Sequence, residues 1–357
     1  SVGAGGGSII WLDETGSLRV GPRSAGADPG PACYGRGSSI PSLTDAMLVA
    51  GWLADGQKLG GRIPLRLDLA RAALAPLAKA LSCSVEAVAD GAISIAIAIM
   101  AAETSHVLSR RGIDAPDLML VPFGGAGPLI GALLAEDVYV DRILVPQTPG
   151  ALSALGAAYS DVQGDLIAPV YRLLDDLEPA ELDRIRRDLE AEARAWLAEE
   201  LQSLSIHGAD FSFAADMRYE GQGYDVTVPL PTPVLDAGEI GAVATAFAST
   251  YRAIYGHDNE RAGVWLKELR LRVVGRVPRP SASSLPRGTG AAARARRTIR
   301  IADAAVDAAV YDRAMLGAGD RILGPAIVDQ LDTTLLVPPR WEAEVLRSGA
   351  ILMTFGG

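Results

Sequence analysis

Three glycine-rich segments mark the places where the main chain could approach a ligand most closely: residues 3–8, 123–128 and 221–223. Glycine has no Cβ, so a flat ring or a polar group can lie directly against the backbone at such a turn. Where the turn opens a helix, the free N–H groups of the helix N-terminus also favour anionic ligand atoms.

The turn at residues 123–128 has the best context of the three. It contains Gly124, Gly125, Ala126 and Gly127 and lies between a predicted strand and a predicted helix. No Lys-Ser or Lys-Thr pair follows these glycines, so the turn is not a P-loop of the Walker A type. A nucleotide-binding turn and simple close packing of strand on helix are both compatible with the motif, which leaves the choice open.

The turn at the start of the chain offers a superficial match to the dinucleotide-binding pattern GxGxxG. It contains Gly5, Gly6 and Gly7, but Ser8 occupies the position of the last glycine. No strand precedes this turn, and an apolar run typical of a strand follows it where a helix is required. These departures exclude a Rossmann site.

The third turn contains Gly221 and Gly223 and lies between two predicted strands. A hairpin turn is the simpler interpretation of this position. Arg218, Tyr219 and Glu220 give the turn a polar edge, so a contact role stays open.

Few other residues point to chemistry. Asp45 is a candidate carboxylate of a site, with a helix N-cap as the alternative. The two cysteines and three histidines lack CxxC, Cys/His or His-ligand spacing, so neither a disulfide framework nor a histidine-based metal site is predicted. No Ser/His/Asp or Cys/His arrangement selects a nucleophile, and catalytic residues are therefore not assigned.

The composition limits the classes of partner. The formal net charge is -10 and the pI is about 4.9, which argues against a broad surface for nucleic acid or anionic lipid. These values are usual for a soluble bacterial protein, and a cytoplasmic location is expected. Hydrophobic residues make up 49% of the chain and aromatic residues only 5%, so small aliphatic side chains must fill a core of helices packed on sheets.

Neither a membrane partner nor a complete chain is expected. The most apolar stretch, residues 92–102, is shorter than the roughly 20 residues that a membrane span needs. The first residues lack the basic region of a signal peptide. Because the chain begins inside a glycine turn and without an initiator Met, we expect a truncated piece of a longer protein.

Hydrophobic periodicity places the first two turns on an α/β framework. A hairpin is predicted around residues 9–20, and helical periods follow at residues 68–80 and 84–111. The second of these helices, with Ser84 as a possible N-cap, is apolar nearly all round and is expected to be buried and central. A strand, the glycine turn, a helix, a strand and a helix follow at residues 118–122, 123–128, 129–136, 142–146 and 149–159.

The second half of the chain changes character. A long amphipathic helix opens an α+β lobe of two strands, a helix and a further strand. Between residues 276 and 297, six arginines, no acidic residues and many Pro, Ser, Ala and Gly residues indicate an exposed linker. Alternating strands and turns in residues 298–357 predict a small β-rich module. The elements of the lobe are predicted at residues 179–204, 211–219, 224–230, 238–255 and 265–274.

Several segments, read together and in order, resemble the hydantoinase A/oxoprolinase family. The resemblance runs essentially from end to end of the chain, and several of the matching strings are long. It rests on residues 2–9, 20–22, 24–35, 44–46, 123–128, 149–156, 218–219, 221–222, 255–256 and 324–328.

The resemblance implies the second half of an actin- and sugar-kinase-like (ribonuclease H-like) ATPase fold, in which two halves face each other across a nucleotide cleft. The turn at residues 123–128 would hold adenosine. The family's DxGGT-type phosphate loops would precede residue 1, so the isolated chain, which lacks the parts that position the phosphates and Mg²⁺, is expected to be inactive. The residues that would bind or lie near ATP are Gly5, Gly6, Gly7, Asp45, Gly124, Gly125, Ala126 and Gly127.

The same resemblance sets the expected domain organisation. Residues 1–165 would be the adenosine-side part of the ATPase domain, and residues 166–275 the α+β lobe. Residues 276–297 would be the linker, and residues 298–357 the small β-rich C-terminal module.

The activity implied by the resemblance is ATP-dependent hydrolysis of a small cyclic amide, of the N-methylhydantoinase or 5-oxoprolinase type. The substrate carbonyl would be activated by phosphorylation. The expected partners are the missing N-terminal half of the same subunit and a hydantoinase B-type subunit. Two alternatives stay open: the ATP-using subunit of an acetone-type carboxylase, and a non-catalytic scaffold that holds a B-type subunit.

Overall fold

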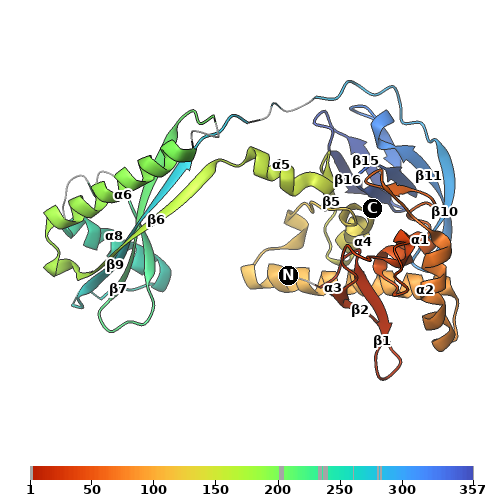
Figure 1. Ribbon diagram of the computed structural model, residues 1–357, viewed down its shortest axis with the longest axis horizontal. Helices are drawn as coiled ribbons and strands as arrows, with labels where there is room; N and C mark the ends of the chain where they lie inside the picture. The colour runs from red at the N-terminus through yellow and green to blue at the C-terminus, as the bar shows by residue number, and fades with distance from the viewer. Residues whose placement is uncertain are drawn as a thin grey trace. The chain divides into compact units, whose positions relative to one another are not determined.

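The computed structural model describes residues 3–200, 205–231, 235, 240–259, 261–279, 281 and 284–356 of the chain. Its architecture is mixed α/β (Figure 1). The chain divides into two domains, of which the first is built from two separate segments of the sequence and the second from the segment between them. The first domain joins Ser1–Leu155 to Ser281–Gly357, and the second is Gly156–Pro280. The C-terminal residues therefore complete the first domain rather than forming the separate module expected for residues 298–357.

The first domain begins with the predicted hairpin. Strand β1 (Ser8–Leu12) pairs antiparallel with β2 (Leu18–Ser24). Asp13 closes the turn between them by accepting hydrogen bonds from the N–H groups of Thr15 (3.0 Å) and Ser17 (2.9 Å). The helices and short strands that follow are α1 (Leu43–Val49), β3 (Lys58–Leu59), β4 (Ile63–Pro64), α2 (Leu67–Ala80) and α3 (Val85–Arg111).

Helix α3 begins and ends where its sequence indicates. The Ser84 hydroxyl accepts a hydrogen bond from the N–H of Ala87 (3.1 Å), and Gly112 ends the helix in the left-handed conformation, with φ of 62°. The expectation of a buried central helix is confirmed only for its first half, where side chains from Val88 to Ile97 enter the core. Its last turns are exposed.

Helix α3 is also long and apolar enough, by length and composition alone, to cross a membrane: it contains an 18-residue window with a mean hydropathy of 1.8. The core helix of a soluble domain meets the same criterion. Here the helix contacts α1, α2 and α4 (Gly127–Asp137), and its buried side chains belong to the core of the first domain.

The segment before the glycine turn departs from its prediction. Residues 118–122 were expected to form a buried strand, but they form only an isolated parallel bridge, from Leu120 to Ile143 of β5 (Arg142–Val145). Met119 is 44% exposed and Val121 41% exposed. The segment lies at the edge of its sheet with a neighbour on one side, so apolar character alone does not bury it.

Two four-stranded sheets explain why the C-terminal segment belongs to the first domain. In the first sheet the strand order is β10-β11-β13-β14, and in the second it is β12-β15-β16-β5. Strand β5 is apolar and fully buried at Ile143 and Val145, and it obtains its partner from β16, where Ile351 lies opposite Val145. The new strands are β10 (Ala295–Ile301), β11 (Ala304–Asp312), β12 (Arg321–Leu323), β13 (Ala326–Asp329), β14 (Thr334–Val337), β15 (Trp341–Val345) and β16 (Ile351–Phe355).

The arginine-rich segment 276–297 is not simply an exposed tether. Its end is already part of β10, and five of its arginines form ion pairs with aspartates, so most of its positive charge is neutralised within the fold. The pairs are Arg276–Asp210, Arg279–Asp161, Arg294–Asp329, Arg296–Asp307 and Arg297–Asp329.

The second domain is an antiparallel sheet with helices packed on one face. The strand order is β6-β9-β7-β8, and helices α6 (Pro179–Glu200) and α8 (Ile240–Tyr255) contribute to the same apolar core as the inward side chains of the sheet. The strands are β6 (Val162–Leu173), β7 (Ala209–Tyr219), β8 (Val226–Leu230) and β9 (Val264–Gly275).

The α+β lobe is thus confirmed, with one strand added. Residues 201–204, 238 and 239, at the ends of two predicted helices, lie outside the described residues. Strand β6 was not predicted, because Gly164 and Pro169 interrupt its alternating pattern. The short helices of the chain are η1 (Ala32–Tyr34), η2 (Ala115–Asp117), η3 (Pro149–Ala151), α5 (Leu152–Tyr159), η4 (Leu174–Asp176) and η5 (Arg313–Met315).

Candidate functional site

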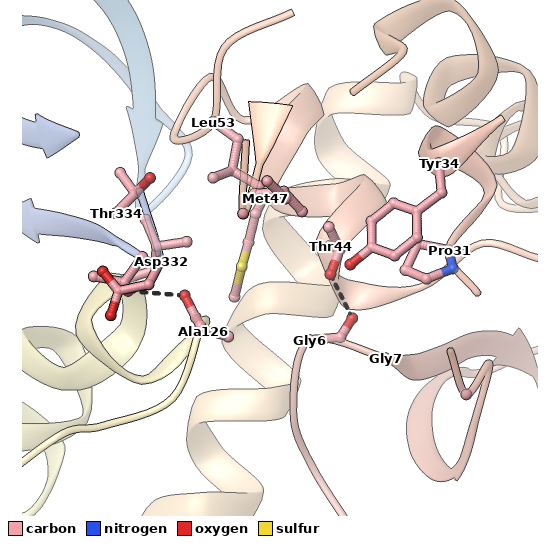
Figure 2. A pocket seen from close by; sticks show the side chains of 16 residues that line it. Gly6, Gly7, Pro31, Tyr34, Thr44, Met47, Leu53, Ala126, Asp332 and Thr334 are labelled. Carbon is pink, nitrogen blue, oxygen red and sulfur yellow. Dashed lines mark hydrogen bonds between the residues drawn. The ribbon is translucent and has the colours of Figure 1, made fainter. Parts of the chain in front are cut away.

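A cavity of about 300 Å³ in the first domain brings two of the predicted glycine segments together (Figure 2). Four stretches of sequence form its wall: the N-terminal turn, residues 26–60, the glycine turn with the first residues of α4, and the loop that leads into β14. The lining residues are Gly6, Gly7, Gly26, Pro31, Tyr34, Thr44, Met47, Leu53, Leu59, Gly60, Gly125, Ala126, Leu129, Asp332, Thr333 and Thr334.

The N-terminal turn is fixed to helix α1 by Thr44. The Gly6 carbonyl accepts hydrogen bonds from both the hydroxyl and the N–H of Thr44, each 2.8 Å long. Gly6 also approaches the second glycine turn so closely that a Cβ built on it would lie 3.4 Å from the Cβ of Ala126. Two segments far apart in sequence therefore meet at the cavity, and a Cβ at Gly6 would also lie 3.0 Å from the Thr44 hydroxyl oxygen, which would have to shift slightly.

The turn before α4 is held from its outer side. Gly124 has a φ of 80°, which glycine adopts without strain, and its N–H donates to the Pro149 carbonyl (2.8 Å). The Thr333 hydroxyl donates to the Gly125 carbonyl (3.0 Å). Ala126, the N-cap residue of α4, makes no side-chain capping bond, so the start of the helix is not capped by the protein side chain that usually occupies this position.

The Gly/Pro-rich segment 26–35 supplies part of the cavity wall through Gly26, Pro31 and Tyr34. Tyr34 projects its hydroxyl into the cavity toward Thr44 (Figure 2). Burial raises the pKa of the Tyr34 phenol, so this group stays neutral at physiological pH and can both donate and accept hydrogen bonds.

The cavity combines an apolar interior with few polar groups. Met47 and Leu53 lie between the two walls, with Gly6, Gly7 and Tyr34 on one side and Ala126, Asp332 and Thr334 on the other (Figure 2). Asp332 is the only charged residue of this lining, and its carboxylate accepts a hydrogen bond from the N–H of Gly150 (2.8 Å). Apolar walls with a few placed polar groups and exposed backbone suit a flat, partly polar small molecule.

Only some of the predicted site residues line the cavity. Gly6, Gly7, Gly125 and Ala126 line the cavity. Gly5, Gly124 and Gly127 lie beside them in the same two turns and shape the backbone without lining it; the N–H of Gly5, for example, donates to the Ser8 hydroxyl (2.9 Å).

Of the two roles open to Asp45, the structure shows the one in which it caps the start of a helix, since its carboxylate is fully buried and does not line the cavity. It sits at the third position of α1 and forms a capping box with Ser42, whose N–H and hydroxyl donate to it at 2.7 and 2.8 Å. It also accepts hydrogen bonds from the N–H groups of Ala32 (3.3 Å) and Cys33 (2.7 Å). The neighbouring Thr44, not Asp45, reaches the cavity.

Sequence reasoning missed several residues of the wall. Thr44 and Tyr34 were within matching motifs, but nothing in the sequence separated them from their neighbours. Asp332, Thr333 and Thr334 lie more than 200 residues beyond the glycine turn in sequence, in a segment expected only to form a strand. A polar Asp-Thr-Thr group between two apolar strands was the one available signal.

No metal centre is evident in the described part of the chain. Among those residues there is no group of three or more His, Cys, Asp or Glu side chains that could hold a metal ion. The cavity therefore offers hydrogen-bonding and apolar surface, and its own side chains do not form an ion site.

Comparisons with solved structures agree with the mixed α/β fold. The nucleotide-free structure of acetone carboxylase superposes with a TM-score of 0.84 at 23% identity, covering 99% of this chain and 52% of that one. The crystal structure of ATP-dependent caprolactamase from Pseudomonas jessenii superposes with a TM-score of 0.74 at 32% identity, with the same coverage.

Sequence comparisons give related proteins. The caprolactamase subunit alpha of Pseudomonas jessenii is 33% identical over 100% of this chain and 52% of its own length. The acetophenone carboxylase gamma subunit of Aromatoleum aromaticum is 29% identical over 99% of this chain and 50% of its own length. The chain thus spans about half the length of these relatives.

Two family profiles cover most of the chain. The hydantoinase/oxoprolinase profile matches residues 1–165, and the hydantoinase/oxoprolinase C-terminal domain profile matches residues 179–348. The matched ranges contain the three glycine turns and the segments of the cavity wall described above. The chain belongs to the hydantoinase/oxoprolinase family.

Proposed function

We propose that this chain is the adenosine-binding part of an ATP-dependent cyclic-amide hydrolase subunit. In the proposed architecture the first domain forms the second half of an actin- and sugar-kinase-like ATPase fold, and the α+β domain is inserted between its two segments. The cytoplasmic location expected from the composition is part of the same proposal.

One observation carries the proposal: the turn before α4 and the N-terminal glycine turn converge on one cavity. Gly125 and Ala126 would lie against the adenine ring or the ribose, and Gly6 and Gly7 would form the facing wall. The apolar side chains of Met47 and Leu53 suit the flat faces of a purine, and the neutral hydroxyls of Thr44 and Tyr34 suit its polar edges.

ATP would supply the phosphoryl group that activates the substrate carbonyl. Positioning and charge neutralisation dominate such transfers. Mg²⁺ would accompany the phosphates, and the part of the subunit that the relatives have beyond the length of this chain would hold them. A B-type subunit would complete the site for the cyclic amide. The related proteins whose names include alpha and gamma subunits support a multi-subunit assembly.

The test is the substitution Gly125→Val in the complete subunit. A Cβ at Gly125 would meet nothing closer than 3.9 Å, and its φ is not in the left-handed range, so the side chain should enter the cavity without breaking the fold. We expect ATP-dependent ring opening to be abolished. The matched control is Gly223→Val in the other glycine turn, where a Cβ has no neighbour within 4 Å. Unchanged turnover in Gly125→Val would refute this assignment.

A carboxylase role is the second candidate, favoured by the identity with the acetophenone carboxylase gamma subunit. The nucleotide cavity would serve both reactions, so only the co-substrate separates them. Bicarbonate-dependent consumption of a ketone by the assembled complex would establish the carboxylase, and lactam turnover without bicarbonate would exclude it. If calorimetry of the complete subunit with ATP and Mg²⁺ gave no heat, the chain would instead be a scaffold for its partner.

A further inference from the structure

The loop between β13 and β14 is bonded to two other segments that carry the cavity wall and to a third beside it. The Thr333 hydroxyl donates to the Gly125 carbonyl (3.0 Å) and lies 3.4 Å from the Gly124 carbonyl. The Leu331 carbonyl accepts from the N–H of Gly60 (3.1 Å). Asp332 accepts from the N–H of Gly150 (2.8 Å), which belongs to the segment that supports the glycine turn.

Asp332 lies so close to Gly150 that there is no room for a side chain at position 150. A Cβ on Gly150 would lie 2.6 Å from the Asp332 carbonyl oxygen and 2.8 Å from the Asp332 Cβ. The neighbouring Pro149 carbonyl accepts the N–H of Gly124 (2.8 Å). The loop thus holds the glycine turn in two ways, directly through Thr333 and indirectly through Gly150 and Pro149.

The direct contact fixes the direction of a backbone donor. A peptide group is planar and trans, so the Gly125 carbonyl and the Ala126 N–H, which belong to one peptide group, point in opposite directions. Because Thr333 fixes the direction of the carbonyl, it also fixes that of the Ala126 N–H at the wall of the cavity. Thr333 is 5% exposed, so water cannot readily replace its hydroxyl.

We propose that Thr333 is a positioning residue for nucleotide binding, and that the loop at residues 330–333 holds the glycine turn in its binding geometry. The C-terminal segment would therefore be part of the nucleotide site rather than a separate structural module. This inference rests on the proposed function, since it names a determinant of the same site.

The test compares Thr333→Val and Thr333→Ser in the complete subunit. Val keeps the shape of Thr and removes the hydroxyl, whereas Ser keeps the hydroxyl. The dissociation constant for ATP with Mg²⁺ is measured by calorimetry, and the unfolding temperature is measured on the same samples. We expect Thr333→Val to bind ATP about 10-fold more weakly, the effect of about one neutral hydrogen bond, and Thr333→Ser to bind within about twofold of the wild type.

The matched control is Thr250→Val, which makes the same change of side chain in α8 of the second domain, where the hydroxyl donates to the Ala246 carbonyl of its own helix (2.9 Å). It should leave ATP affinity unchanged and alter the unfolding temperature little, because the Ala246 carbonyl keeps its place in the helix. Gly150→Ala is a second probe, because its methyl group would displace Asp332 and should weaken ATP binding with the Thr333 hydroxyl intact.

The outcomes separate the inference from the proposed function. Weakened ATP binding in Thr333→Val, retained binding in Thr333→Ser and an unaffected control would support the positioning role. Wild-type affinity in Thr333→Val and Gly150→Ala would overturn it and leave the proposed nucleotide site in place. No binding of ATP by the wild-type subunit would overturn the proposed function itself, and this inference with it.

Discussion

Two glycine turns of similar sequence character have very different surroundings in the folded chain. Gly124 and Gly221 both adopt the left-handed conformation, with φ of 80° and 83°. The turn at Gly124 leads into a helix N-terminus beside a cavity, and its carbonyl groups are held by a residue more than 200 positions away. The turn at Gly221 is closed by its own neighbours, as Gln222 accepts the N–H of Tyr219 (3.3 Å) and donates to Tyr251 (2.6 Å).

The second turn is a hairpin, as its position between two strands predicted, because β7 and β8 pair antiparallel on either side of it. Aromatic rings fill the space behind it: Tyr219 packs edge-on against Phe247 at 4.8 Å and against Tyr251 at 4.9 Å. In both turns glycine provides the left-handed backbone conformation. Whether a ligand can enter depends on the residues that pack behind the turn, and those residues come from distant parts of the sequence.

The largest expected loss of stability comes from removing the large aromatic side chain that packs behind the turn at Gly221. Phe247 is fully buried in the core of the second domain, so Phe247→Ala should lower the free energy of unfolding of that domain by about 3–5 kcal/mol. Chemical denaturation followed by tryptophan fluorescence would measure it, with the exposed Tyr224→Ala as control. If the two turns have separate roles, ATP affinity under native conditions stays unchanged; a loss of affinity would break the comparison.

A smaller effect is expected at Asp45, the carboxylate first predicted to be in the site. Asp45→Ala leaves buried N–H groups of Cys33 and Ser42 without their acceptor, and should cost about 3 kcal/mol of first-domain stability. Asp68→Ala, at an exposed carboxylate paired with Arg66, should give no measurable change. If Asp45→Ala kept wild-type stability but lost ATP binding, Asp45 would be a residue of the nucleotide site after all.

The smallest expected loss of stability comes from the same substitution made in each of the two glycine turns, which compares them directly. Gly124→Ala and Gly221→Ala each place a Cβ in open space on a left-handed backbone, so each should cost about 1 kcal/mol of stability in its own domain. Only Gly124→Ala should weaken ATP binding, by about 10-fold. Equal loss of affinity in both variants, measured by calorimetry, would show that the turns do not differ in function.

Local pattern predicted most of the elements and four of the sixteen residues that line the cavity. The hairpin at residues 9–20, the helices α2, α3 and α4, and the strands β7, β8 and β9 follow from hydrophobic period, capping residues and turn residues, all of which act over a few positions. Gly6, Gly7, Gly125 and Ala126 were found because glycine is informative wherever it occurs in a turn. The side chains of Thr44, Tyr34 and Thr333 carry no such local signal.

The errors have a common cause in long-range packing. Residues 118–122 and 298–357 were assigned by local apolar pattern, but burial of a strand depends on how many neighbours it obtains. The first segment pairs on one side only, whereas β16 crosses back to pair with β5. The arginines of residues 276–297 also looked like a solvated linker, because their aspartate partners lie elsewhere in sequence, as in the pair Arg276–Asp210.

The sequence by itself determined that this chain carries glycine turns on an α/β framework, and it indicated the family through motifs in a fixed order. Backbone freedom and hydrophobic period are properties of neighbouring residues, so they can be read without a fold. Only the tertiary structure decided that two of the turns share a cavity, that Asp45 caps a helix, and that the C-terminal loop with Thr333 holds the glycine turn. Those outcomes depend on contacts between distant segments, which form only when buried strands and helices have found their partners.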